Sequence, residues 1–278
     1  MNTKRTLLPV IKWSGSKRYL AENILKYFPE RIETYYEPFV GGGSVLGKML
    51  HTCPDRSERY VAGDLCAPLI DLWNAIQTNP SMLLEWYRRH WTMLQEHGQE
   101  IYYEARERFN QSYRPEDFLF LSRTCMNGLI RFNRNGEFNS SFHLNRPGIN
   151  PANFHPILCT WSSLVADVQF VCADYMETTK EATAKDLIYF DPPYQGTRGM
   201  YSGTFETTRF FTYLRNLNAR GVRWILSYDG TRGEKDMTAG VPEDLYARHV
   251  YIYSGCSSFS RIKERGIVNV KESLYINW

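Results

Sequence analysis

Hydrophobic positions along the chain follow two patterns that alternate. Short apolar runs predict β-strands at residues 35–40, 59–63, 168–172, 186–190, 222–227, 246–252 and 267–276. Apolar residues at helical spacing predict helices at 16–28, 44–51, 67–77 and 151–166. Strands that alternate with helices indicate an α/β protein, with a doubly wound and mostly parallel sheet of the Rossmann-like type.

The middle of the chain departs from this alternation. Residues 81–126 predict helices rich in aromatic residues and arginine, without a clear strand. Residues 129–143 predict a β-hairpin with Asn135-Gly136 as its two-residue turn, because both turn positions need positive φ. We therefore expect a helical and hairpin insert within the sheet domain. The expected boundaries are 1–66 and 167–278 for the sheet domain and 67–166 for the insert.

Composition narrows the class of protein without identifying it. The 278 residues, 43% hydrophobic, are enough for one large α/β domain with an insert. The net charge is only +3, so a phosphate-binding surface requires local clustering of basic residues. The six cysteines show no C-x-x-C pair and the histidines no H-x-x-x-H or H-x-E pair, so we expect no metal site. The cysteines fit reduced thiols, so a cytoplasmic protein is expected, and no apolar run approaches the ~18–20 residues of a membrane span.

The strand at 187–190 ends in Asp191-Pro192-Pro193-Tyr194. This run places a carboxylate, two rigid turn residues and an aromatic ring at the carboxyl end of a strand, where open α/β sheets bind ligands. Methylation of a nucleobase amine uses such groups, because the amine needs hydrogen-bond acceptors and the unstacked base needs a flat surface. Taken alone, the run is equally compatible with a strand followed by a surface turn.

A glycine turn lies upstream, between the strand at 35–40 and a helix that begins at Ser44. The next strand ends at Asp64, 21 residues after Gly43, a spacing that suits a carboxylate on a ribose hydroxyl. An adenosine-containing cofactor is therefore expected. NAD is the rival, but Leu46 stands where its fingerprint needs a third glycine.

With these motifs the chain resembles the Dam-type DNA adenine-N6 methyltransferases, which use S-adenosylmethionine. Four segments carry the resemblance, in the family's order of cofactor, recognition and catalysis, and together they span about residues 11–276. They are 11–17 (IKWSGSK), 37–45 (EPFVGGGSV), 124–139 (TCMNGLIRFNRNGEFN) and 191–194 (DPPY).

The resemblance implies roles for particular residues. In catalysis, Asp191 and the carbonyl of Pro192 accept the two N6 hydrogens, and Tyr194 stacks on the flipped base. The expected S-adenosylmethionine contacts are Trp13, Lys17, Glu37, Phe39, Gly41, Gly43, Asp64, Asp174 and Asp191.

The insert is the expected DNA-binding region. Residues 123–146 carry four arginines against one acid and no lysine, and arginine suits both guanine edges and phosphates. The resemblance assigns base reading to Arg131, with Met126 at a position where close family members have an aromatic residue. A solvated basic hairpin is the alternative. The expected DNA contacts are Arg123, Met126, Asn127, Leu129, Arg131, Asn133 and Arg134, with Arg261 and Lys263 from a later basic stretch.

The expected function is site-specific transfer of a methyl group from S-adenosylmethionine to adenine N6 in double-stranded DNA. Two alternatives stay open: methylation of cytosine N4, and a catalytically idle DNA-binding module of the same fold. We expect no membrane association and no obligate protein partner. A bacterial, plasmid or phage origin and a restriction endonuclease counterpart are both compatible with this class.

Overall fold

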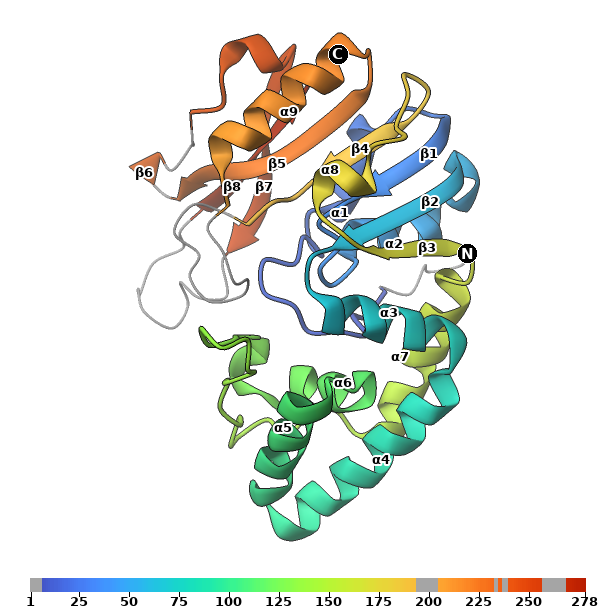
Figure 1. Cartoon of the computed structure of the whole chain (residues 1–278), viewed down its shortest axis with the longest axis vertical. Helices are drawn as coiled ribbons and strands as arrows, with labels where there is room; N and C mark the ends of the chain where they lie inside the picture. The colour runs from blue at the N-terminus through green and yellow to red at the C-terminus, as the bar shows by residue number, and fades with distance from the viewer. Residues whose placement is uncertain (1–6, 194–204, 233–234, 237–239, 257–268) are drawn as a thin grey trace.

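A computed structural model describes residues 7–193, 205–232, 235–236, 240–256 and 269–278. Its centre is a single β-sheet with the strand order β3-β2-β1-β4-β5-β8-β7 (Figure 1). The strands are β1 (Ile32–Glu37), β2 (Ser57–Asp64), β3 (Val168–Cys172), β4 (Leu187–Phe190), β5 (Arg223–Arg232), β7 (Arg248–Cys256) and β8 (Asn269–Ile276), with the short β6 (Lys235–Asp236) paired to β5.

The pairing directions confirm the doubly wound, mostly parallel sheet. Strands β3, β2, β1, β4 and β5 are parallel to one another, and β8 is antiparallel to both β5 and β7. The strand order reverses between β1 and β4, which pair through Tyr35↔Leu187 and Tyr36↔Ile188. The carboxyl ends of β1 and β4 therefore flank the switch point, where α/β sheets bind their ligands.

Helices cover both faces of the sheet, with α8 and α9 in front and α1 and α2 behind (Figure 1). The bounds are α1 (Ala21–Ile24), α2 (Ser44–Thr52), α8 (Tyr175–Thr178) and α9 (Thr207–Ala219), with 3-10 turns η1 (Leu25–Tyr27), η2 (Pro54–Arg56) and η4 (Glu243–Leu245). The helix predicted at 16–28 is wrong at its start, because the chain before Ala21 runs along the pocket and buries Lys17 there. Helix α9 was not predicted, although its buried Phe210, Leu214 and Leu217 have helical spacing.

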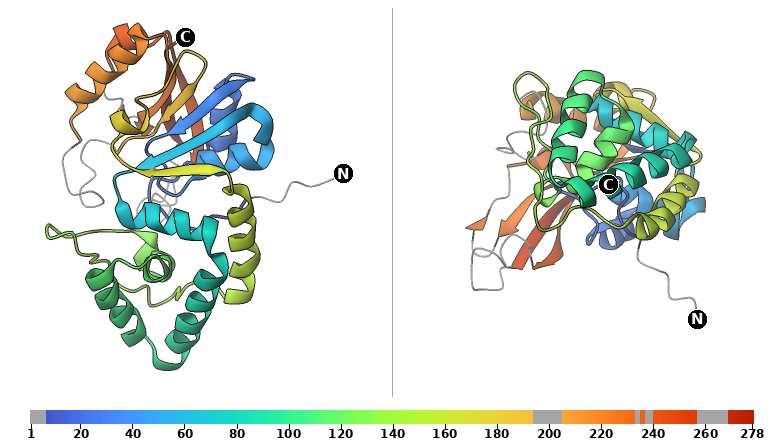
Figure 2. Two further views of the ribbon diagram at one scale, coloured as in Figure 1. Left: turned by 45° about the vertical axis from the view of Figure 1, so that its right-hand side comes forward. Right: turned by 90° about the horizontal axis from the view of Figure 1, so that it is seen from below.

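The expected insert begins and ends with helices that also belong to the sheet domain. Its elements are α3 (Ala67–Thr78), α4 (Pro80–His97), α5 (Glu100–Ser112), α6 (Pro115–Thr124), η3 (Met126–Gly128) and α7 (Pro151–Leu164). Figure 2 shows α4 to α6 below the sheet, with α3 and α7 joining the two parts. Trp73 of α3 stacks on Phe170 of β3 with 5.4 Å between the ring centroids, and Trp161 of α7 packs on Trp73. One hydrophobic core therefore continues from the sheet into the insert.

An ion pair with a buried carboxylate joins α4, α5 and α6 of the insert. Asp117 of α6 is fully buried and accepts from Arg108 Nε of α5 at 2.9 Å and from Trp86 Nε1 of α4 at 3.2 Å. The guanidinium also lies against the ring of Trp86 and within 3.1 Å of His90 Nε2. A buried carboxylate needs such partners, because an unpaired charge in the core is costly.

The hairpin predicted at 129–143 is present only as a looser loop. Isolated antiparallel bridges, Cys125↔Phe142 and Phe132↔Phe138, stand in place of continuous strands. The prediction of a two-residue Asn135-Gly136 turn is wrong, because Gly136 has a φ of 80° whereas Asn135 does not have positive φ. The Gly136 N–H donates to the Asn133 carbonyl at 3.0 Å, as in a three-residue turn with glycine last. The Asn133 side chain stabilises the turn by accepting from the N–H groups of Asn135 and Glu137.

Candidate active site

A pocket opens at the switch point between β1 and β4. It brings together the segment before α1, the glycine turn after β1 and the proline turn after β4, three of the four motifs singled out in the sequence. Its lining includes Trp13, Lys17, Glu37, Phe39, Gly41, Asp191, Pro192 and Pro193.

The glycine turn owes its shape to close contacts on both sides. Gly41 has a φ of 46°, and a Cβ added there would lie 2.7 Å from Nε1 of Trp13, so a larger residue is excluded. Trp73 Nε1 donates to the Gly41 carbonyl at 3.0 Å. Gly43, with a φ of 63°, is the N-cap of α2, and its Cβ would collide with Trp73. The tryptophans of the pocket and of α3 thus fix the backbone against which a cofactor would lie.

Asp64 lies behind this turn. Its Oδ2 accepts from the Gly41 N–H at 3.2 Å and its Oδ1 from the Cys66 N–H at 3.0 Å. The side chain is 1% exposed and is not part of the pocket lining. As placed, the carboxylate supports the turn, and its contact with a ribose stays a prediction.

Acidic and basic side chains converge at the base of the pocket. Lys17 Nζ lies 2.8 Å from Asp191 Oδ1 and 3.0 Å from Glu272 Oε1, and only 6% of the lysine side chain is exposed. Burial raises the pKa of Asp191 to about 6, although the Lys17 ammonium opposes this shift. A carboxylate with this pKa is mostly ionised near neutral pH, so it accepts hydrogen bonds.

Glu37 ends β1, the strand beside β4, and also lines the pocket. It is 3% exposed and accepts from the Tyr35 hydroxyl at 2.6 Å. Burial raises the pKa of Glu37 to about 8, and the negative charge of Asp191 adds to the shift. With this pKa Glu37 is mostly protonated near neutral pH, whereas Asp191, paired with Lys17, is mostly ionised.

Two further predicted cofactor contacts, Phe39 and Asp174, differ in their relation to the pocket. Phe39 lines the pocket and stacks on Tyr175 of α8 at 5.7 Å. Asp174 is the N-cap of α8, accepting from the Glu177 N–H, and its other oxygen lies 3.4 Å from Arg209. Asp174 is not part of the pocket lining, so its cofactor role stays a prediction.

The structure does not support the predicted DNA contact of Arg123. Its side chain is 4% exposed, and its guanidinium donates to the carbonyls of Pro9 and Val10 at 3.0 and 2.7 Å. The guanidinium also lies over the ring of Phe154 at 4.7 Å. Arg123 therefore links α6 to the segment before the pocket. It was predicted as a DNA contact from the local excess of arginine, and composition does not show which face of a helix a residue occupies.

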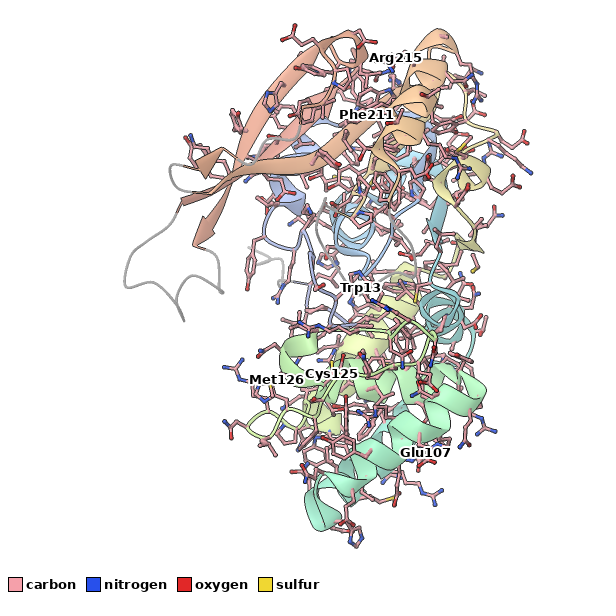
Figure 3. The ribbon with its side chains drawn as sticks, turned by 60° about the vertical axis from the view of Figure 1, so that its left-hand side comes forward. Trp13, Glu107, Cys125, Met126, Phe211 and Arg215 are labelled. Atoms are coloured by element: carbon pink, nitrogen blue, oxygen red, sulfur yellow. The ribbon has the colours of Figure 1, made fainter. Side chains whose placement is uncertain are left out.

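Other predicted DNA contacts are accessible on the insert. Met126, Asn127, Arg131 and Arg134 are exposed, and Leu129 is half-buried. Asn127 has a φ of 55°, a conformation that few residues other than glycine and asparagine adopt readily. Figure 3 shows Trp13 between the sheet and the insert, with Met126 at the edge of the insert below it. Three predicted residues lie outside the described residues: Tyr194, Arg261 and Lys263.

The sequence reasoning missed Glu272 and Trp73. Glu272 lies in β8 and contacts Lys17, and the strand NVKESLYI carries polar residues beside it, so no signal in its sequence singles out Glu272. Trp73 lies on the buried face of α3, where an indole N–H needs an acceptor, but the acceptor is known only from the fold.

In the described part of the chain, the acidic, cysteine and histidine residues form no group of three or more able to hold a metal ion. Within the same part, no helix is both long and apolar enough to cross a membrane.

A doubly wound sheet with a glycine turn after β1 and an acidic proline turn after β4 is the arrangement of α/β proteins that bind a ligand at the switch point of the sheet. The sequence pattern of one family matches residues 13–267, and the chain belongs to that family, the D12 class N6 adenine-specific DNA methyltransferases.

Three relatives illustrate the likeness. A DNA adenine methylase of Vibrio cholerae serotype O1 is 35% identical over 188 residues, which cover 66% of this chain and 64% of that protein. The type II methyltransferase M.MjaIII of Methanocaldococcus jannaschii is 30% identical over 245 residues, covering 79% of this chain and 83% of the relative. A DNA adenine methylase of Escherichia coli strain K12 is 32% identical over 207 residues, covering 73% and 70%.

Proposed function

We propose that the protein transfers a methyl group from S-adenosylmethionine to the N6 amine of an adenine flipped out of double-stranded DNA. The observation that carries this proposal is the position of Asp191 and Pro192. They follow β4 and share one pocket with the glycine turn that follows β1. Membership of the D12 class N6 adenine-specific family supports the choice of adenine.

The lining of the pocket offers groups that suit S-adenosylmethionine. The Gly41 turn brings backbone to the pocket wall, and Trp13 and Phe39 offer flat apolar surfaces. Asp191 supplies negative charge, and a sulfonium cation nearby would favour ionisation of Glu37, whose pKa burial raises to about 8. When bound, the cofactor supplies a methyl group on a positively charged sulfur.

The chain's own contribution is to position the amine. Lys17 binds Asp191 at Oδ1, which directs Oδ2 toward the amine as an acceptor. The Pro192 carbonyl is the second acceptor, and the proline nitrogens of the turn carry no competing N–H. With both N6 hydrogens held, the nitrogen lone pair faces the methyl donor, and the rate gain comes mainly from orientation. Stacking by Tyr194 completes this proposal as a prediction.

The exposed loop of the insert supplies the DNA contacts in this proposal. Arg131 is a base reader, Arg134 a phosphate contact, and Met126 a wedge beside the flipped base. Flipping costs a few kcal/mol, which contacts in the pocket and beside the vacated stack offset. A DNA substrate is the partner this requires. The absence of an obligate protein partner, the restriction endonuclease counterpart and the cytoplasmic setting stay predictions.

Asp191→Ala tests the assignment. We expect methyl transfer to fall by about a hundredfold or more, since a transition-state hydrogen bond of this kind contributes that much, while DNA affinity stays within a few fold. The matched control is Asp244→Ala, which removes an exposed carboxylate paired with Arg215 far from the pocket. Single-turnover rates with labelled cofactor measure both variants, and a wild-type rate for Asp191→Ala contradicts the proposal.

A further inference from the structure

Lys17 is shared between two carboxylates that come from different strands. Its ammonium lies 2.8 Å from Asp191 Oδ1, after β4, and 3.0 Å from Glu272 Oε1, in β8. The Ser227 hydroxyl of β5 donates to the same Oε1 of Glu272 at 3.1 Å. A chain of contacts therefore runs from β5 through Glu272 and Lys17 to Asp191.

This arrangement fixes the position of the Lys17 ammonium. Lysine has a long, flexible stem and a compact charge, so one carboxylate alone does not fix its direction. Glu272 holds the ammonium from the β8 side, and Ser227 fixes Glu272 in turn. The ammonium then approaches Asp191 at one oxygen and is not free to turn toward both.

We propose that Glu272 is a positioning residue for the reaction, which acts through Lys17 to orient Asp191 and keep its Oδ2 for the target amine. This inference rests on the proposed function. Glu272 itself is not part of the pocket lining, so it is not expected to touch substrate or cofactor.

Charge sharing has a second consequence for Asp191. The Lys17 ammonium lowers the pKa of Asp191 and the Glu272 carboxylate raises it. The other titratable groups described around this carboxyl are Glu37 of β1 and Tyr189 of β4, both of which interact with its charge. Because Glu272 takes part of the lysine charge, Asp191 stays more basic and is a better hydrogen-bond acceptor.

Opposite shifts in the pH profile test the inference. Transfer requires ionised Asp191, so the single-turnover rate rises with pH through the pKa of this group. Glu272→Gln keeps the shape and removes the charge, and we expect the rising limb to move about one unit lower and the plateau rate to fall about tenfold. Lys17→Met should move the limb in the other direction. Dissociation constants for S-adenosylmethionine and DNA should stay within about threefold in Glu272→Gln.

Glu33→Gln is the matched control, because Glu33 is a more exposed glutamate of β1 paired with Arg59 and Lys185. Glu33→Gln should leave both the rising limb of the pH profile and the plateau rate unchanged. If Glu272→Gln does not fold, Ser227→Ala keeps all charges and should lower the plateau rate several-fold.

The inference is overturned if folded Glu272→Gln has the pH profile and plateau rate of the wild type, or if the rising limb of its pH profile moves to higher pH. A wild-type plateau rate in Ser227→Ala also overturns it. The proposed function fails separately, if Asp191→Ala retains activity. An inactive Asp191→Ala beside an unaffected Glu272→Gln removes only the role of Glu272.

Discussion

In the pocket, the charged side chains are buried or half-buried and contact one another, whereas Arg131 and Arg134 on the loop at 125–143 are exposed. Glu37 and Asp191 lie at the carboxyl ends of β1 and β4, where the sheet fixes their backbone, and Lys17 lies in the segment before α1. Arg131 and Arg134 stand on a loop fixed by isolated bridges and by side chains of α5. The pocket groups therefore contact one another, while the loop presents exposed arginines that the proposed function assigns to DNA.

The loop and the pocket are therefore stabilised by different parts of the structure. The loop packs on helices that are joined by the Arg108–Asp117 ion pair, just as the pocket contains the Lys17–Asp191 ion pair. Tyr102 of α5 donates to the Ser140 carbonyl at 2.8 Å, and the side chain of Asn110 makes two hydrogen bonds with the backbone of Phe138. An exposed recognition loop thus depends on rigid support beneath it.

The largest expected effect comes from breaking that support. Asp117→Ala removes the buried partner of Arg108 and of the Trp86 indole, and we expect the free energy of unfolding to fall by about 3 kcal/mol. Urea denaturation measures this loss. The control is Glu85→Ala, which breaks an exposed pair with Arg88 and should cost under about 1 kcal/mol. Equal effects would show that the Asp117 pair is no more important than a surface pair.

A smaller effect should separate base reading from phosphate contact on the loop. Arg131→Ala should relax the preference at one base pair by about 1–3 kcal/mol and leave the others intact. Arg134→Ala should weaken binding to all sequences equally and reduce the salt slope by about one. Methylation rates on single-base variants of the target, at two salt concentrations, measure both. If Arg131→Ala slows every substrate by one factor, base reading lies elsewhere in the insert.

The smallest of these effects concerns the glycine turn. Asp64→Ala removes the acceptor of the Gly41 N–H, and we expect the dissociation constant for S-adenosylmethionine to rise about tenfold, as for one charge-assisted hydrogen bond. Calorimetry gives this value, with the exposed Glu58→Ala of the same strand as the control. An affinity equal to that of the wild type would mean that neither the turn nor the ribose depends on Asp64.

The same contrast explains what was predictable from the sequence. Strands and glycine turns leave local signals, so the sheet was predicted and residues far apart in the chain, such as Trp13 and Asp191, line one pocket. The burial of Arg123 has no local signal, because it depends on where the segment before the pocket lies across α6. Glu272 needed the antiparallel placement of β8 beside β5, a long-range pairing that periodicity does not reveal.

The hairpin shows a second limit. Asn-Gly was the expected two-residue turn, but the side chain of Asn133 accepts from two backbone N–H groups and favours the longer three-residue form. Turn type therefore depended on one polar side chain two residues upstream. The function of the loop as a DNA-reading element stays a prediction, because its expected partner is a separate molecule.

The central claim is that this pocket methylates the N6 amine of adenine in DNA. The most direct measurement uses double-stranded DNA of random sequence, S-adenosylmethionine labelled in its methyl group, and digestion of the product to nucleosides. We predict that the label appears in N6-methyldeoxyadenosine and that Asp191→Ala removes it. Label in N4-methyldeoxycytidine, or cofactor and DNA binding without any transferred label, would contradict the account.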